Sequence, residues 1–384
     1  MKLLILSPYF APYTGVGALR MTSLAAYLVK NGHQVSVIKA EDSAYPPEMA
    51  TGKRLEGIRY FEYAMVPGDE TRNSRVLGQI LTDILNKESY DCLLATFGPY
   101  DTVRPLLEMR KTCQIPLVVD YRDLWLYDPR PVTTWKSRLV RIYEYLRNKG
   151  TEKRLMRACS AFVSITPRSV QTMRDKYPVL QEKSFCVYNG YTPVPLECAG
   201  SSDASAEASA VLCVLGKFSS YTAAGAEAFL KAVHRLNEKG IAVQIQHFGP
   251  CDQQALKTCE KIGMEETEYL ECGQLPYEKA MQAAASATLC AVVINYAEGL
   301  GTKVFDYIYL NKPIVAYAPP NSEFEALLQG AENAFVGQTA QQLADAIEKV
   351  ITEKRTVLTE DDDFRNRFSR DAQNQQYYEM LKTL

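Results

Sequence analysis

The sequence predicts an α/β protein with two doubly wound domains, each a parallel sheet covered by helices on both faces. The chain has 384 residues, which at about 150 residues per domain suggests two domains. In both halves short apolar runs alternate with helical patterns, as expected when helices join parallel strands. A stretch of small polar residues at 196–210 divides the chain nearly in half. We therefore expect one such domain on each side of it.

The first half begins with an apolar strand at residues 2–7, followed by a loop that contains Gly15 and Gly17. A helical pattern then covers 18–31, and the next strand starts at 35–38. The order strand, glycine loop, helix, strand is typical of a doubly wound domain. Further apolar strands are expected at 92–95, 117–119 and 161–165.

The second half repeats this organisation. A strand at 211–215 ends at Gly216-Lys217, and a helix is expected over 224–239. After an acidic run at 360–363, a last helix is expected over 364–381. Further strands are expected at 243–248, 269–270, 289–294 and 314–317. The predicted organisation is a first domain over 1–195, a linker over 196–210, a second domain over 211–363 and a C-terminal helical segment over 364–384 that packs on the first domain.

The composition excludes several classes of protein. With 47% hydrophobic and 23% charged residues, the chain is neither disordered nor embedded in a membrane. A net charge of -2 gives no general attraction to nucleic acid. The three histidines and ten cysteines show no metal-ligand spacing, so we expect no bound metal and no cofactor. The apolar N-terminus is too short for a signal peptide, and we expect a cytoplasmic protein with reduced cysteines.

The most informative motif is Glu298-Gly-Leu-Gly-Thr-Lys-Val-Phe-Asp306, which follows an apolar strand. Its two carboxylates can accept hydrogen bonds from sugar hydroxyls, and the backbone N–H groups between them suit a phosphate. Lys217, after the first strand of the same half, can add a positive charge. A plain surface ion pair between Lys303 and Asp306, three residues apart on a helix, is the alternative interpretation.

This motif resembles the two-carboxylate signature of retaining glycosyltransferases with the GT-B fold, most closely family 4. The resemblance extends over nearly the whole chain. Leu6-Ser-Pro-Tyr-Phe-Ala-Pro-Tyr-Thr-Gly-Val-Gly-Ala18 is similar to the acceptor-side loop of that family, and Asp120-Tyr-Arg-Asp-Leu-Trp125 to a segment found in a subset of it. The resemblance implies two Rossmann-like domains that face each other across a cleft, the first for the acceptor and the second for the donor. It also implies a C-terminal helix that crosses back to the first domain.

The resemblance and the motifs together predict the site residues. The predicted catalytic residues are Glu298, Lys303, Lys217, Asp123 and Arg122. Two positions depart from the family: Asp306 stands where a Glu is usual, and Ala224 where a second basic residue is usual. The predicted substrate-binding residues are Gly15, Gly17, Gly216, Phe218, Gly249, Gly273, Leu275, Gly299, Leu300, Gly301, Thr302 and Asp306.

The resemblance implies transfer of a sugar from a nucleotide-diphosphate sugar to a glycan or lipid-linked acceptor. It further implies retention of configuration, no metal requirement and a role in bacterial surface polysaccharide biosynthesis. Two alternatives remain: a non-catalytic GT-B subunit that binds a partner or glycan, and a GT-B sugar-nucleotide epimerase.

A basic segment at 130–157 has nine basic residues against two acidic ones, with Trp135 and other apolar residues between them. Such a segment can lie on anionic lipid, which would place the protein at the inner face of the cytoplasmic membrane. A solvated helix face is the alternative.

Overall fold

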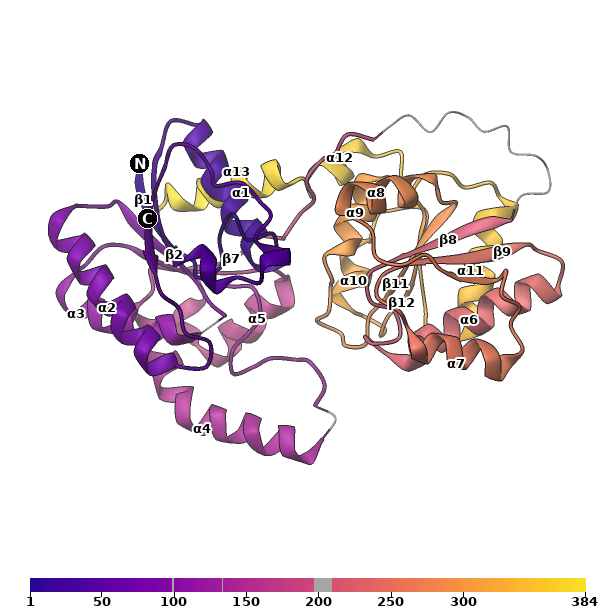
Figure 1. Ribbon diagram of the computed structural model, residues 1–384, viewed down its shortest axis with the longest axis horizontal. Coiled ribbons are helices and arrows are strands. Elements are labelled where there is room, and N and C mark those ends of the chain that lie inside the picture. The colour runs from indigo at the N-terminus through magenta and orange to yellow at the C-terminus, as the bar shows by residue number, and fades with distance from the viewer. Residues whose placement is uncertain (99, 133, 197–208) are drawn as a thin grey trace. The chain divides into compact units, whose positions relative to one another are not determined.

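The computed structural model describes residues 1–98, 100–132, 134–196 and 209–384. It contains two compact units (Figure 1). The first comprises residues 1–189 and 370–384, and the second residues 190–369. Most of the predicted linker at 196–210 lies outside the described residues.

The first unit contains a seven-stranded parallel sheet in the order β3-β2-β1-β4-β5-β6-β7. Alternate residues of β1 face opposite sides, because side chains of a strand alternate. Leu3 and Ile5 belong to a core with α1 and α13, whereas Leu4 and Leu6 belong to a core with α2, α3 and α4. The strands are β1 (Lys2–Leu6), β2 (Gln34–Ala40), β3 (Ile58–Tyr63), β4 (Cys92–Thr96), β5 (Leu117–Tyr121), β6 (Ala161–Ser164) and β7 (Ser184–Cys186), and the helices are α1 (Val16–Lys30), α2 (Glu70–Lys87), α3 (Val103–Thr112), α4 (Trp135–Ala158), α5 (Pro167–Lys176) and α13 (Arg370–Leu381).

The second unit contains a six-stranded parallel sheet in the order β10-β9-β8-β11-β12-β13. Local sequence defines several of its helix ends. The Asp252 carboxylate accepts the Ala255 N–H at the start of α7, and Thr339 and Gln342 form a capping box at the start of α11. The strands are β8 (Ala210–Leu215), β9 (Val243–Phe248), β10 (Tyr269–Glu271), β11 (Leu289–Val293), β12 (Ile314–Tyr317) and β13 (Ala334–Gly337), and the helices are α6 (Ala223–Glu238), α7 (Gln253–Ile262), α8 (Tyr277–Ser286), α9 (Lys303–Tyr309), α10 (Glu323–Leu327), α11 (Ala340–Thr352) and α12 (Asp362–Asn366).

The two parallel sheets with helices on their faces confirm the predicted fold class. The prediction of a single C-terminal helix over 364–381 is wrong. The chain instead forms α12, which belongs to the second unit, and after a short break α13, which belongs to the first. Asp361 caps α12 by accepting the Phe364 N–H, and the burial of Phe364 and Phe368 favours a turn between the helices.

Candidate functional site

The second unit has its topological switch point between β8 and β11. From β8 the chain continues to β9 and β10 on one side of the sheet, and from β11 to β12 and β13 on the other. Ligands of such sheets bind beyond the carboxyl ends of the strands at this point. The turns that follow β8 and β11 carry Gly216 and Lys217, and residues 296–302, respectively. The structure therefore brings together the two parts of the second half that the sequence predicts to bind the donor.

The turn after β8 is held by backbone contacts. The Gly216 N–H donates to the Phe248 carbonyl at 2.8 Å, and Gly216 has a φ of 83°, which favours glycine. Buried His247 places Nε2 2.6 Å from the Gly216 carbonyl oxygen. A side chain at Gly249 would overlap that same carbonyl. Gly216 and Gly249 thus fix the shape of this turn, and His247, which the sequence reasoning did not assign to the site, supports it.

The turn after β11 also depends on its glycines. The Gly299 N–H donates to the Tyr296 carbonyl at 3.0 Å, and a Cβ at Gly299 would lie 2.8 Å from the Ile294 side chain. Gly301 has a φ of 65°. Leu300 is buried. Within the described part of the chain, the N–H groups of Gly301 and Thr302 at the end of the turn and of Lys303 at the start of α9 have no hydrogen-bond acceptor.

Asp306 lies on α9 and is held by two neighbours. Its Oδ1 accepts a hydrogen bond from the Tyr277 hydroxyl at 2.7 Å, and its Oδ2 lies 3.4 Å from the Lys303 Nζ. The Lys303 Nζ also lies 5.5 Å from the centre of the Tyr277 ring. The ion pair between Lys303 and Asp306 therefore exists, and Tyr277, which no sequence signal marked, orders it. A Cβ at Gly216 would lie 3.9 Å from Lys303 Cε, so the lysine stem reaches the turn after β8.

Glu298 and Lys217 differ from Asp306 in having no such neighbours. Glu298 is half-buried and Lys217 is exposed. Neither side chain has a hydrogen bond or ion pair with another described residue. At this edge of the sheet they are a carboxylate and an ammonium group that a ligand can reach.

Three predicted binding residues do not lie at the switch point with their side chains accessible. The Phe218 side chain is 0% exposed and packs against Phe229 and Tyr269, so this side chain is part of the core. Gly273 and Leu275 follow β10, which is the outer strand of the sheet, two strands away from β8. They lie at the edge of the carboxyl side rather than at the switch point.

The predicted glycine loop of the first unit packs against neighbouring residues of the same unit. A Cβ at Gly15 would overlap the Tyr13 ring, which explains the glycine without any ligand. The Thr14 N–H donates to the Met49 carbonyl at 2.7 Å. Gly17, in contrast, lies beside a predicted catalytic residue, because its Cβ would be 2.9 Å from an Arg122 nitrogen. The Arg122 guanidinium in turn donates to the Asp123 carboxylate at 2.8 Å.

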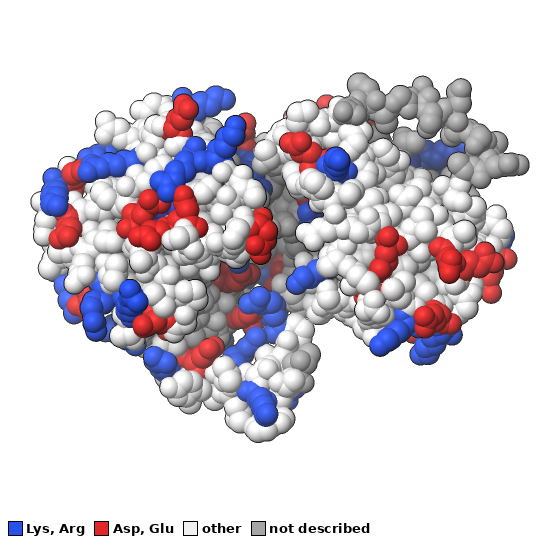
Figure 2. Space-filling view, viewed as in Figure 1, with Lys and Arg blue, Asp and Glu red and all other residues white. Residues whose placement is uncertain are grey.

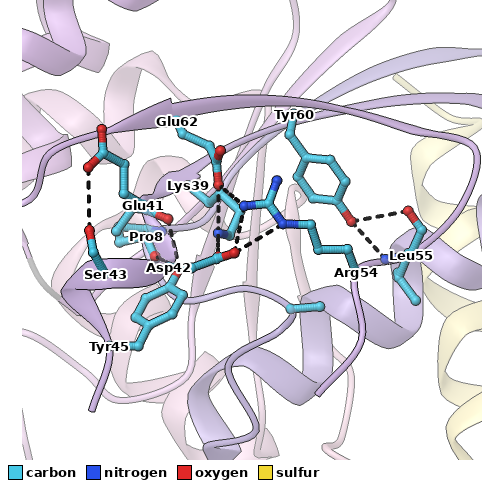
Figure 3. Close-up of polar contacts among 12 residues, drawn as sticks. Pro8, Lys39, Glu41, Asp42, Ser43, Tyr45, Arg54, Leu55, Tyr60 and Glu62 are labelled. Atoms are coloured by element: carbon cyan, nitrogen blue, oxygen red, sulfur yellow. Dashed lines mark hydrogen bonds and ion pairs between the residues drawn. The ribbon is translucent and has the colours of Figure 1, made fainter. Parts of the chain in front are cut away.

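A charge network at the carboxyl ends of β2 and β3 holds the neighbouring loop (Figure 3). Buried Lys39 pairs with Asp42 at 2.5 Å and with Glu62 at 3.1 Å. Arg54 pairs with the same two carboxylates at 2.6 and 2.7 Å. Burial alone would raise the pKa of Asp42, but the hydrogen bonds from Lys39 and Arg54 bring it below its usual value. These four charges are paired with one another.

Asp120, part of the segment that the sequence resemblance singled out, is buried in an ion pair. Its Oδ2 accepts a hydrogen bond from Arg20 of α1 at 3.0 Å and another from the Tyr377 hydroxyl of α13 at 3.0 Å. Arg20 also donates to the carbonyls of Val187 and Tyr188. Asp120 therefore joins α1, β5 and the C-terminal helix. The sequence pattern did not reveal Arg20, because its partner lies 100 residues away.

The basic segment forms α4, whose apolar residues are unusually exposed. Trp135 is 67% exposed. The other exposed apolar residues of this helix are Leu139, Val140, Ile142, Tyr143 and Leu146. Figure 2 shows charged side chains of both signs over the visible face of the molecule. Among the helices that the structure describes, none is both long and apolar enough to span a bilayer.

Both halves of the chain match models of glycosyltransferase families. Residues 17–193 match Glycosyltransferase Family 4, and residues 209–353 match Glycosyl transferases group 1. No curated protein is similar enough in sequence to count as a relative.

Solved structures with the same fold cover the whole chain. A sucrose-phosphate synthase from Thermosynechococcus elongatus has a TM-score of 0.70 and 14% identity, over 100% of this chain and 99% of that one. Anabaena Alr3699/HepE in complex with UDP has a TM-score of 0.68 and 17% identity, over 100% of both chains. A UDP-GlcNAc 2-epimerase from Methanocaldococcus jannaschii has a TM-score of 0.58 and 10% identity, also over 100% of both chains. These similarities confirm the GT-B fold.

Proposed function

We propose that the protein transfers a sugar from a nucleotide-diphosphate sugar to a glycan or lipid-linked acceptor. The matches of residues 17–193 to Glycosyltransferase Family 4 and of residues 209–353 to Glycosyl transferases group 1 support this proposal. The observation that carries this proposal is the switch point of the second unit. Among the described residues, its turn after β11 carries Glu298 and the N–H groups of 301–303, none of which has a partner, and its turn after β8 carries Lys217, which has none either. This set fits a diphosphate joined to a sugar. Anabaena HepE, a neighbour with the same fold, binds UDP.

The charges of the site fit the chemistry of sugar transfer. When the bond between the anomeric carbon and the phosphate oxygen breaks, negative charge builds on the departing diphosphate. Lys217, Lys303 and the N–H groups after β11 would stabilise that charge, and no metal ion is required in this proposal. Each charge-assisted hydrogen bond contributes about 1.5 to 3 kcal/mol. Direct contacts to the diphosphate would thus supply most of the stabilisation.

The two carboxylates would bind the sugar side of the donor. Glu298 is free to accept hydrogen bonds from sugar hydroxyls, whereas Asp306 is already held by Tyr277 and Lys303. We assign Glu298 to the transferred sugar and Asp306 to the positioning of Lys303. Transfer would proceed with retention of configuration, with the acceptor hydroxyl attacking from the face that the diphosphate leaves.

The acceptor side is proposed for the first unit, where Gly17, Arg122 and Asp123 lie together. The exposed apolar and basic side chains of α4 support contact with anionic lipid. We therefore propose a cytoplasmic enzyme that works at the inner face of the membrane. Its proposed role is in surface polysaccharide biosynthesis. Equal binding of the protein to anionic and neutral vesicles would contradict the membrane contact.

A thermal-shift screen against UDP-, GDP-, ADP- and dTDP-sugars tests donor binding. A donor that binds the native state raises the melting temperature. Glu298→Gln and Lys217→Ala should each lower the transfer rate at least about 100-fold, because each removes a group proposed to contact the donor. The melting temperature without donor should stay unchanged, because neither side chain has a protein partner to lose. Glu332→Gln and Lys257→Ala are matched controls, since both residues are exposed and unpaired in the same unit. Full activity of both site variants would rule out this site assignment.

The products formed in the transfer assay distinguish two other functions. An epimerase would convert the donor sugar without an acceptor, and the epimerase from Methanocaldococcus jannaschii shares the fold. A non-catalytic subunit would give no turnover with any donor. Exposed Ala224 in the first turn of α6, where a basic residue is expected, favours this last possibility, whereas the unpaired Glu298 and Lys217 favour catalysis.

A further inference from the structure

Tyr277 connects the segment after β10 to the switch point of the second unit. Gly273 and Leu275 of this segment lie near the edge of the sheet, but Tyr277 at the start of α8 reaches α9. Its hydroxyl donates to Asp306 Oδ1 at 2.7 Å, across 29 residues of sequence. The Tyr277 side chain is 42% exposed, so core packing does not explain a tyrosine at this position.

The Lys303 side chain is held from three directions. Its Nζ lies 3.4 Å from Asp306 Oδ2 and 5.5 Å from the centre of the Tyr277 ring. Its Cε lies beside Gly216, where a Cβ would be 3.9 Å away. A lysine has a flexible four-carbon stem, so without such contacts its ammonium group would occupy many positions. Contacts from α8, from α9 and from the turn after β8 therefore restrict this ammonium group.

The hydrogen bond from Tyr277 controls how Asp306 faces the lysine. A carboxylate has two acceptor oxygens, and the tyrosine hydroxyl occupies Oδ1, which leaves Oδ2 toward Lys303. The Asp306 side chain is only 10% exposed, so water is a poor substitute for that hydroxyl. Without it the carboxylate would be free to rotate and to draw the ammonium group away from its position.

Lys303 also keeps the capacity to bind an anion. Its distance of 3.4 Å to Asp306 exceeds the about 2.7 to 2.9 Å of a strong charge-assisted hydrogen bond. An ammonium group has three donors, of which Asp306 uses one. The Lys303 side chain is 40% exposed, and the N–H groups of Gly301 and Thr302 precede it directly. An anion at this turn can contact both the N–H groups and the lysine.

We propose that Tyr277 is a positioning residue of the donor site, which acts through Asp306 to hold the Lys303 ammonium group where it contacts the diphosphate. Tyr277 need not touch the donor itself. That the bound anion is the diphosphate of a sugar donor rests on the proposed function. The alternative is a purely structural role, in which Tyr277 only ties α8 to α9.

A double-mutant cycle with Lys303 separates these two roles. The probes are UDP, GDP, ADP and dTDP, and isothermal titration calorimetry gives the affinity of each protein for the probe that binds most tightly. Lys303→Met should weaken binding at least about tenfold, because it removes a charge-assisted contact. Tyr277→Phe keeps the ring and removes only the hydroxyl, and it should weaken binding at least about threefold.

The decisive measurement is Tyr277→Phe in the Lys303→Met background. There it should change the affinity less than about twofold, because the group that Tyr277 positions is absent. A structural role does not depend on Lys303 and would give the same loss in both backgrounds. The matched control is Tyr309→Phe, which removes a hydroxyl that donates to the Val194 carbonyl at 2.8 Å in the same unit. This control should leave the affinity unchanged.

Two outcomes overturn the proposal and leave the proposed function standing, since the natural protein still binds the nucleoside diphosphate in both. One is an unchanged affinity of Tyr277→Phe, which would show that the hydroxyl does not position Lys303. The other is an equal loss with and without Lys303, which would show that Tyr277 acts on the fold. Failure of the natural protein to bind any of the four probes would instead reject the donor site, and this proposal with it.

Discussion

The carboxyl edges of the two sheets use their charged residues in different ways. Both units are doubly wound, with a switch point beside the first strand. In the first unit two buried cations at this edge are paired with carboxylates: Lys39 with Asp42, and Arg20 with Asp120. In the second unit Lys217 and Glu298 have no partner among the described residues. The topology provides a switch point in both units. In the first unit these four paired charges hold loops and helices in place, whereas in the second Lys217 and Glu298 are available to a ligand.

The largest expected effect tests the pairing in the first unit. Arg20→Ala leaves the Asp120 carboxylate buried without its cation, and loss of one partner of a buried pair costs about 3 to 5 kcal/mol. Urea denaturation of the variant should show that loss. The control is Arg122→Ala, which removes a half-exposed pair with Asp123 and should cost at most about 1 kcal/mol. Equal effects would show that burial does not distinguish the two pairs.

The next prediction concerns a buried carboxylate of α4. Burial raises the pKa of Glu152 to about 7 from a usual 4.5, while the hydrogen bond from the Tyr177 hydroxyl acts in the opposite direction. Because the folded-state pKa is the higher one, the folded protein holds its proton while the unfolded chain releases it. The stabilising contribution is complete below about pH 4.5 and is lost as the pH rises through about 7, a change of about 3 kcal/mol.

Glu152→Gln removes this titration and keeps an oxygen that can accept the Tyr177 hydrogen bond. The variant should be more stable than the natural protein at about pH 8 and nearly equal to it at about pH 4.5. Denaturation midpoints across this range measure the effect. Glu182→Gln, at an exposed carboxylate of the same unit, should change nothing, and parallel pH profiles for the natural protein and Glu152→Gln would contradict the assignment.

A smaller effect is expected from the turn that shapes the site of the second unit. Gly249→Ala places a methyl group against the Gly216 carbonyl, which cannot move without straining the Gly216 N–H bond to Phe248. Overpacking of this kind costs about 1 to 3 kcal/mol. Donor binding in the thermal-shift screen should weaken as well. Unchanged donor binding would show that this turn does not contribute to the site.

The smallest effect has the opposite sign. Gly150 lies within α4, and a Cβ there would meet no atom within 4 Å. Because alanine favours a helix more than glycine does, Gly150→Ala should stabilise the protein by up to about 1 kcal/mol. Thermal unfolding measures this. A destabilised variant would mean that this face of α4 contacts something, for example a second copy of the chain.

Most of the fold could be predicted from the sequence, and less of the site. Apolar strands and glycine-terminated helices mark a doubly wound unit locally, so the main strands are where the pattern predicts them. The C-terminal helix was predicted as one element because its break follows from the burial of Phe364 and Phe368, not from a helix-breaking residue. Phe218 is among the predicted binding residues, but its side chain is buried in the core, which the local sequence after β8 does not reveal.

The sequence by itself determined the fold class, the two-part organisation and the motif around Glu298, because periodicity, glycine spacing and neighbouring side chains are properties of a continuous segment. The tertiary structure alone decided which charges are paired and which are free. Tyr277 reaches Asp306 across 29 residues, and Arg20 reaches Asp120 across 100. A cavity of the first unit is likewise lined by four separate segments: α2, the segment after β4, the loop after β5 and α4. Such pairings depend on distances between strand ends, and only the assembled sheets define those distances.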